Sequence, residues 1–123
     1  MKYYPGGVTT NSGGASGDID PDDEATGQVF EAMIECGTIL SLHPETKVSR
    51  DAFGNITKGF VHRAEREFMS LAERIARKYP ELQIVIEHIS TREMAELVGS
   101  ERYPHLYGSI TPHHLLLTAH DKE

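Results

Sequence analysis

The sequence predicts an α/β fold in which parallel strands alternate with helices. Two observations carry this prediction. Short apolar runs rich in β-branched residues recur along the chain, in "GTILSLHPE" (37–45), "LQIVIEHIS" (82–90) and "LYGSITPHHLLL" (106–117). Stretches with helical spacing of apolar residues lie between these runs. Strands that alternate with helices in this way pair in parallel through crossover connections.

The composition bounds the class of protein and its partners. The chain of 123 residues is one domain at most, and 38% hydrophobic with 25% charged residues is typical of a globular protein. No apolar run approaches the roughly 20 residues that span a bilayer, and no signal-peptide pattern opens the chain, so no membrane partner is expected. A net charge of -7 argues against nucleic acid. The single Cys36 fits a reducing, cytoplasmic location.

The first 17 residues are predicted to form a strand stub and a loop. Lys2–Tyr4 reads as the end of a strand that Pro5 cuts off. The Gly/Ser/Thr/Asn-rich stretch that follows has the composition of a mobile active-site loop, or of a plain linker. Residues 18–123 are then expected to hold the β/α units, and the whole chain is treated as a single domain segment.

The first helix is predicted over residues 22–36. Asp20 is its expected N-cap, with Pro21 at the first helical position. Gly37 is expected to end the helix as its C′ residue. The apolar positions expected on one face are Val29, Phe30, Met33 and Ile34.

The remaining elements follow in order. They are a strand near 38–43, an irregular stretch 44–59, a helix at 60–79, a strand near 83–88, a short helix at 92–98 and a strand near 106–110. The long helix has apolar residues at spacings of three and four, and Pro80 stops it. These residues are Val61, Ala64, Phe68, Leu71, Ala72 and Ile75.

Polar strand ends favour a barrel over a doubly wound sheet. The apolar runs meet histidines: His43, His88, and the pair His113 and His114. Catalytic groups in barrels come from the C-terminal ends of several strands. No G-x-G-x-x-G follows a strand, and "GGVTTNSGG" lacks the P-loop lysine. Since a barrel typically needs about 250 residues, the chain is predicted to form about half of a (β/α)8 TIM barrel.

Strand periodicity predicts which side chains share a face. Ile84, Ile86 and His88 alternate together, so the two isoleucines are expected to line the barrel interior and His88 to cap its mouth. Glu87 is expected to face outward to the helices as an ion-pair partner. A bulge or twist is expected to bring the His43 ring round.

The motifs resemble those of a known family. "KYYPGGVTTNS", "LSLHPE", "VIEHISTREMAELV" and "SITPHHLLL" occur in the order and near the spacing seen in dihydroorotase of the amidohydrolase superfamily. The resemblance is closest to the homodimeric type of bacteria and plants. It covers essentially the whole chain but only the central part of the enzyme.

The resemblance implies the reversible cyclisation of N-carbamoyl-L-aspartate to L-dihydroorotate in pyrimidine synthesis, with two zinc ions bridged by a carboxylated lysine. It places Lys2 on that lysine, and His43 and His88 on the histidines of the more exposed zinc. Thr9 and Thr10 fall on the loop that closes over substrate. Neutral imidazoles are good zinc ligands at about 2.0–2.1 Å, so the two rings are expected within about 4 Å of each other.

Departures from the family are equally informative. Pro44 stands where the family has glycine, and no His-x-His pair occurs in the chain. The family's catalytic Asp and its substrate-binding Arg and Asn fall outside these residues. No catalytic residue is therefore assigned, at most one partial zinc site is expected, and the chain alone is expected to be inactive.

Several alternatives stay open. On the residues alone, Lys2 reads as a solvated terminal lysine, Thr9 and Thr10 as ordinary loop residues, and a strand-end histidine as a structural one. His113 and His114 are read as structural or as supporting groups. The remaining histidines, His62, His105 and His120, are read as surface residues.

The competing function is a non-catalytic α/β assembly module, or a vestigial protein that retains the fold. A barrel segment leaves open sheet edges, so a homo-oligomer is expected, or completion by the rest of a barrel.

Overall fold

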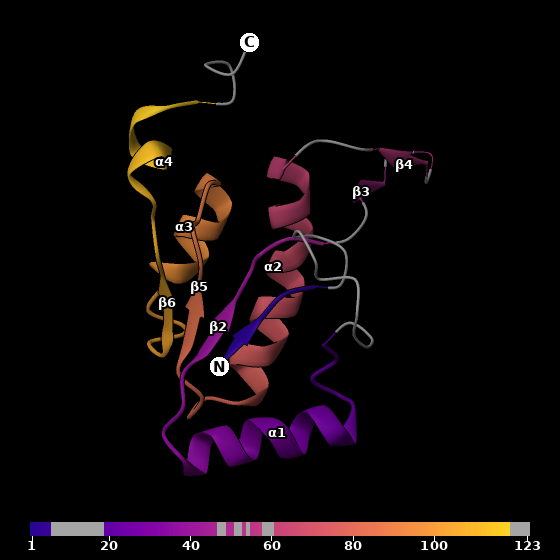
Figure 1. Cartoon of the computed structure of the whole chain (residues 1–123), viewed down its shortest axis with the longest axis vertical. Helices are drawn as coiled ribbons and strands as arrows, with labels where there is room; N and C mark the ends of the chain where they lie inside the picture. The colour runs from indigo at the N-terminus through magenta and orange to yellow at the C-terminus, as the bar shows by residue number, and fades with distance from the viewer. Residues whose placement is uncertain (6–18, 47–48, 51–52, 54, 58–60, 119–123) are drawn as a thin grey trace.

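The centre of the protein is a four-stranded parallel sheet (Figure 1). The computed structural model describes residues 1–5, 19–46, 49–50, 53, 55–57 and 61–118. In spatial order the strands are β1 (Lys2–Tyr3), β2 (Leu40–Leu42), β5 (Ile84–Ile86) and β6 (Leu106–Gly108). Every neighbouring pair in this sheet is parallel. The predicted α/β fold is therefore confirmed, and the predicted N-terminal stub forms its first strand.

Two helices cover one face of the sheet, α2 (Val61–Lys78) and α3 (Arg92–Val98). The strands present four side chains to this face that are each at most 1% exposed: Leu40, Leu42, Ile84 and Ile86. They share one hydrophobic core with helix residues Phe68, Ala72, Ile75, Ala76 and Met94. Their burial makes this layer the main source of stability, at about 25 cal/mol per Å² of apolar area removed from water.

The opposite face of the sheet is more exposed and more polar. Here Ser41 lies in register between Lys2 of β1 and Val85 of β5. The prediction that Ile84 and Ile86 line a barrel interior is wrong, because both pack under the helices. Period-two alternation shows which residues share a face but not which of the two faces the helices cover.

Helix α1 (Glu24–Glu35) lies across the end of the sheet at which the strands begin (Figure 1). Its N-cap is Asp23 and not Asp20, because the Asp23 Oδ2 atom accepts a hydrogen bond of 2.9 Å from the backbone N–H of Thr26. Asp20 instead closes the preceding turn, where its carbonyl oxygen accepts from Asp23 N at 3.1 Å.

The buried face of α1 is narrower than predicted. Phe30 and Met33 are buried, whereas Val29 is 43% exposed. Gly37 follows the helix with φ of 63°, so the predicted left-handed C′ glycine is confirmed.

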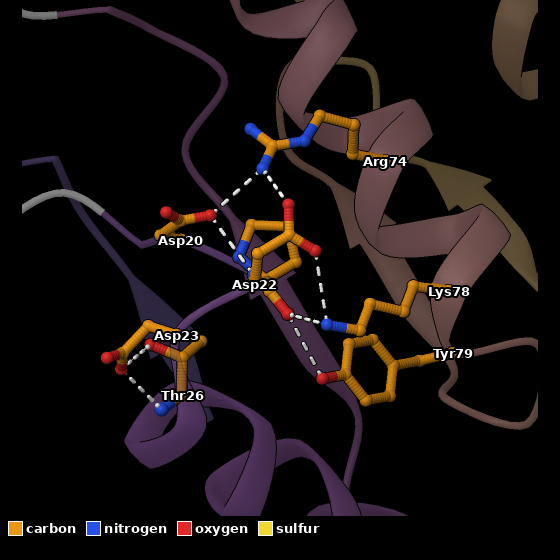
Figure 2. A network of polar contacts seen from close by, with 8 residues as sticks. Asp20, Asp22, Asp23, Thr26, Arg74, Lys78 and Tyr79 are labelled. Carbon is orange, nitrogen blue, oxygen red and sulfur yellow. Dashed lines mark hydrogen bonds and ion pairs between the residues drawn. The ribbon is translucent and has the colours of Figure 1, made fainter.

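A network of charged groups joins the start of α1 to α2 (Figure 2). Arg74 donates hydrogen bonds to the carboxylates of Asp20 and Asp22. The Lys78 ammonium lies 3.1 Å from Asp22 Oδ1 and donates to the carbonyl oxygen of Pro21 at 2.6 Å. The ion pairs are exposed, and such pairs contribute about 0–1 kcal/mol each. Their main effect is to fix where α1 starts relative to α2.

Three short elements were not predicted. An antiparallel pair, β3 (Ser49–Arg50) and β4 (Ile56–Thr57), lies within the stretch expected to be irregular. Strands of two residues are too short to show any periodicity. Helix α4 (Pro112–Leu116) follows β6, which ends at Gly108 rather than near residue 110. Among the described residues no helix is long and apolar enough to cross a membrane.

Candidate functional site

Two histidine rings meet at the end of the sheet where the strands finish. His43 directly follows β2, and His88 lies just beyond β5. The Nε2 atom of His88 lies 2.8 Å from the Nδ1 atom of His43, and the ring centroids are 4.6 Å apart. The predicted convergence of the two rings is therefore confirmed. At this distance one ring donates its N–H and the other accepts.

The backbone at His88 turns its ring toward His43. Simple alternation along β5 would place residue 88 on the helix-covered face with Ile86. His88 instead has φ of 41°, in the left-handed region, which costs a non-glycine residue about 1–2 kcal/mol. The distortion predicted at His43 is thus found at His88, since regular alternation already carries His43 to the face of Ser41.

The surroundings of His88 favour a neutral imidazole. Burial lowers the pKa of His88, and the neighbouring His43 ring lowers it further. A neutral imidazole has a free lone pair and is the form that binds metals. The Nε2 atom of His43 lies 3.3 Å from Glu45 Oε2 but makes no hydrogen bond in the described structure, and it is buried. Pro44, between these two residues, is fully buried.

Glu87 lies on the open face of the sheet, between two serines. Its carboxylate accepts hydrogen bonds of 2.6 Å from Ser41 Oγ and of 2.6 Å from Ser109 Oγ. The prediction that Glu87 faces the helices as an ion-pair partner is wrong, because Ile86 occupies the helix side of β5. The Ser109 and then the Ser41 hydroxyl group lower the pKa of the Glu87 carboxyl, which is therefore an anion at neutral pH.

Lys2 lies on the same open face, in register with Ser41. Its Nζ atom is 4.9 Å from the centroid of the Tyr4 ring. The hydrogen bond with Tyr4 raises the pKa of Lys2, and the Glu87 charge raises it further, against an opposing effect of burial. The amine is therefore a cation at neutral pH, and a cation has no lone pair for a metal.

The described residues supply two donors that suit a metal ion. Two nitrogens at about 2.0–2.1 Å from a tetrahedral zinc stand about 3.3 Å apart, so the rings must separate by about 0.5 Å to admit it. Within the described part of the chain, His, Cys, Asp and Glu form no cluster of three or more that could hold a metal. His43 and His88 thus offer two nitrogens to a metal, and Lys2 as an ammonium offers none.

The other predicted residues are placed as follows. Thr9 and Thr10 lie outside the described residues. His113 and His114 lie side by side on α4, with ring centroids 4.3 Å apart. They belong to a different element from His43 and His88, which follow β2 and β5.

Of the remaining three histidines, the structure describes the side chain of His105 only. His105 is buried, with Nε2 3.0 Å from the carbonyl oxygen of Ala76, so its reading as a surface residue is wrong. The His62 side chain and the whole of His120 lie outside what the structure describes.

One residue next to this site was not predicted from the sequence. Glu65 of α2 is 2% exposed, and its carboxylate accepts hydrogen bonds from the backbone N–H and hydroxyl groups of both Ser90 and Thr91. It therefore holds the two residues that follow Ile89 after the His88 turn. The spacing of residues in the sequence could have predicted its burial. Glu65 precedes Phe68 by three positions and Ala72 by seven, which places it on the buried stripe of the helix.

Comparison with curated proteins gives consistent relatives. The chain is 37% identical over 121 residues to a dihydroorotase of Helicobacter hepaticus and 35% identical over 123 residues to one of Shewanella woodyi. Each match covers 98% of this chain and 31% of the relative, so the chain spans about a third of the length of these proteins. No protein-family model matches the chain.

Solved structures give the same result. The fold is similar to a dihydroorotase from Campylobacter jejuni, with a TM-score of 0.78 at 37% identity over 98% of this chain and 31% of that one. It is also similar to a dihydroorotase from Saccharomyces cerevisiae in complex with 5-fluoroorotic acid, with a TM-score of 0.73 at 30% identity over 98% and 34% of the two chains. The parallel sheet with its helices matches a fragment of a dihydroorotase TIM barrel.

Proposed function

We propose, from the premise that this chain is homologous to a segment of dihydroorotases, that it forms part of the active site of such an enzyme. The reaction proposed is the reversible cyclisation of N-carbamoyl-L-aspartate to L-dihydroorotate in de novo pyrimidine biosynthesis, in the cytoplasm. The observation that carries the proposal is the 2.8 Å approach of His43 Nδ1 and His88 Nε2 beyond two neighbouring parallel strands.

His43, His88 and Lys2 are proposed to hold zinc, with Lys2 in carboxylated form. Two such ions occur per site in the family resembled, and at most one partial site falls within this chain. Bound zinc would polarise the amide carbonyl of the substrate and make hydroxide available near neutral pH. The rings suit this role because each already presents a nitrogen to the position between them. Thr9 and Thr10 are proposed as substrate-binding residues on the resemblance alone.

Lys2 must change its charge state before it can take part. Carboxylation needs the neutral amine, whereas Tyr4 and Glu87 raise the pKa of Lys2 and so favour the ammonium. The side chain is also exposed, and the strand that carries it has only two residues. We therefore expect weak zinc binding by this chain alone and no measurable hydrolysis of dihydroorotate.

Zinc titration of four variants tests the proposal. His43→Ala and His88→Ala should each remove zinc binding, because each deletes one of two preformed donors. Lys2→Ala should weaken binding when bicarbonate is present and have no effect when it is excluded. His113→Ala, which changes an exposed histidine on α4, is the matched control and should bind zinc as the unmodified chain does. Equal zinc affinity for the His43 and His113 variants would contradict the proposal.

The second candidate, a non-catalytic assembly module, is favoured by the apolar surface next to β6. Five large apolar side chains in this region are between 49% and 81% exposed: Tyr107, Ile110, Leu115, Leu116 and Leu117. Strand β6 is also an edge of the sheet. Such an edge favours pairing with a second copy or with further barrel units. A monodisperse monomer in light scattering at micromolar concentration would count against this candidate.

A further inference from the structure

Ser109, just after β6, makes hydrogen bonds to four consecutive residues at the end of β5. Its backbone N–H donates to the Ile86 carbonyl oxygen at 2.9 Å, and its own carbonyl oxygen accepts from Ile89 N at 2.8 Å. Its hydroxyl donates to Glu87 Oε2 at 2.6 Å and accepts from His88 N at 2.8 Å. The two backbone bonds therefore bracket His88, at which the chain turns left-handed, and the hydroxyl binds the N–H of His88 directly.

The direction of these bonds follows from charge. The Glu87 carboxylate has no proton to give, so the hydroxyl of Ser109 must donate to it. That leaves the lone pairs of the hydroxyl oxygen for the backbone N–H of His88. Ser41 Oγ donates to the other carboxylate oxygen of Glu87 at 2.6 Å and holds it from the β2 side. The hydroxyl of Ser109 is thus fixed in one orientation.

We propose that the Ser109 hydroxyl is a positioning group for the histidine pair, because it holds the His88 N–H in the turn that aims the His88 ring at His43. The part that concerns zinc rests on the proposed function. The part that concerns ring orientation does not, since it concerns the direct 2.8 Å contact between the two rings.

The first experiment examines the rings in the metal-free chain. Long-range ¹H–¹⁵N NMR spectra of the imidazoles should show His43 and His88 each in a single tautomer, unlike the exposed His113 in the same sample. Ser109→Ala should lose this signature in both rings, while Ser109→Thr, which keeps a hydroxyl, should retain it. Ser41→Ala is the matched control, because it removes a serine from Glu87 but leaves the bond from His88 N to Ser109 in place.

The second experiment is a titration of the same variants with zinc chloride against a chromophoric chelator. Groups that orient metal ligands typically contribute about 10- to 100-fold to affinity. Ser109→Ala should therefore bind zinc at least about tenfold more weakly, with Ser109→Thr and Ser41→Ala close to the unmodified chain. Wild-type ring spectra and wild-type zinc affinity in folded Ser109→Ala would overturn the inference.

Two further outcomes are informative. If circular dichroism shows that Ser109→Ala is unfolded, Ser109→Cys replaces only oxygen by sulfur, and it should show the same loss of the ring signature. Retention of that signature in Ser109→Cys would overturn the inference. If the unmodified chain binds no zinc, the proposed function fails, while the metal-free spectra still decide whether Ser109 orients the rings.

Discussion

Replacing Glu65 by alanine should destabilise the fold more than any surface substitution. The carboxylate is 2% exposed and is the shared acceptor for two backbone N–H groups and two hydroxyls. The distances are 3.1 Å from Ser90 N, 3.0 Å from Thr91 N and 2.7 Å from Thr91 Oγ1. Thr91 is in turn the N-cap of α3, because its hydroxyl accepts from Met94 N at 3.3 Å.

The size of the effect follows from what remains after the carboxylate is removed. Hydroxyls can rotate toward other partners, but the two N–H groups cannot. Each buried donor left without a partner costs about 1–3 kcal/mol, so with two such donors Glu65→Ala should lose about 2–6 kcal/mol. A domain of this kind has about 5–15 kcal/mol of total stability, so the loss is a large share of it. Glu65→Gln keeps one acceptor oxygen and should lose about 1–2 kcal/mol.

Urea denaturation followed by circular dichroism measures this directly. The midpoint should fall while the slope with urea stays constant, because the area exposed on unfolding is unchanged. Glu31→Ala, at an exposed glutamate of α1, is the control and should stay within about 0.5 kcal/mol of the unmodified chain. If Glu65→Ala also stays within about 1 kcal/mol, the hydrogen bonds to this carboxylate do not stabilise the fold as argued.

Two further predictions concern packing and pH. A Cβ at Gly108 would lie 2.2 Å from the Ile89 Cδ1 atom, so Gly108→Ala should cost about 1–3 kcal/mol in urea unfolding. Adding Ile89→Val removes that methyl group and should recover part of the loss; no recovery would show that the contact is not the cause. Hydrogen bonds from Arg74 and Lys78 lower the pKa of Asp22 below its ordinary 3.8, so the stability they contribute is present above pH 3.8 and is lost as pH falls through the folded pKa. NMR titration of Arg74→Ala should show the pKa of Asp22 shifted back toward 3.8, and an unchanged midpoint would contradict this assignment.

Much of the fold could be predicted because its signals are local. The helical stripe of α2 and the glycine after α1 are each specified within a few residues. The structure confirms the burial of Phe68, Ala72 and Ile75 and the left-handed Gly37, while the Val61 side chain lies outside the described residues. The direction of the strands followed from their alternation with helices. The start of α1 was misplaced because several acidic residues precede it, and each of them is a plausible cap.

Which face of β5 packs under the helices could not be predicted in the same way. Ile84 and Ile86 alternate with Val85 and Glu87, and both faces of a barrel strand take apolar residues. The actual phase is decided by the helix layer, where Phe68 and Ile75 complete the core with the two isoleucines. Glu87 then lies on the other face by necessity, where Ser41 and Ser109 bind it.

The convergence of His43 and His88 was predictable, but the means by which it is reached was not. Strand-end histidines on neighbouring parallel strands indicated a shared site, yet regular alternation places the two rings on opposite faces of the sheet. A left-handed residue at position 88 resolves the conflict, at a cost in backbone energy that persists only when the surroundings hold it. Ser109 holds the N–H at the turn itself, and Glu65 holds the two residues that follow Ile89. Both contacts come from parts of the chain distant in sequence, the residue just after β6 and helix α2. The geometry of the histidine pair is therefore a property of the tertiary structure and not of the strand on which His88 lies.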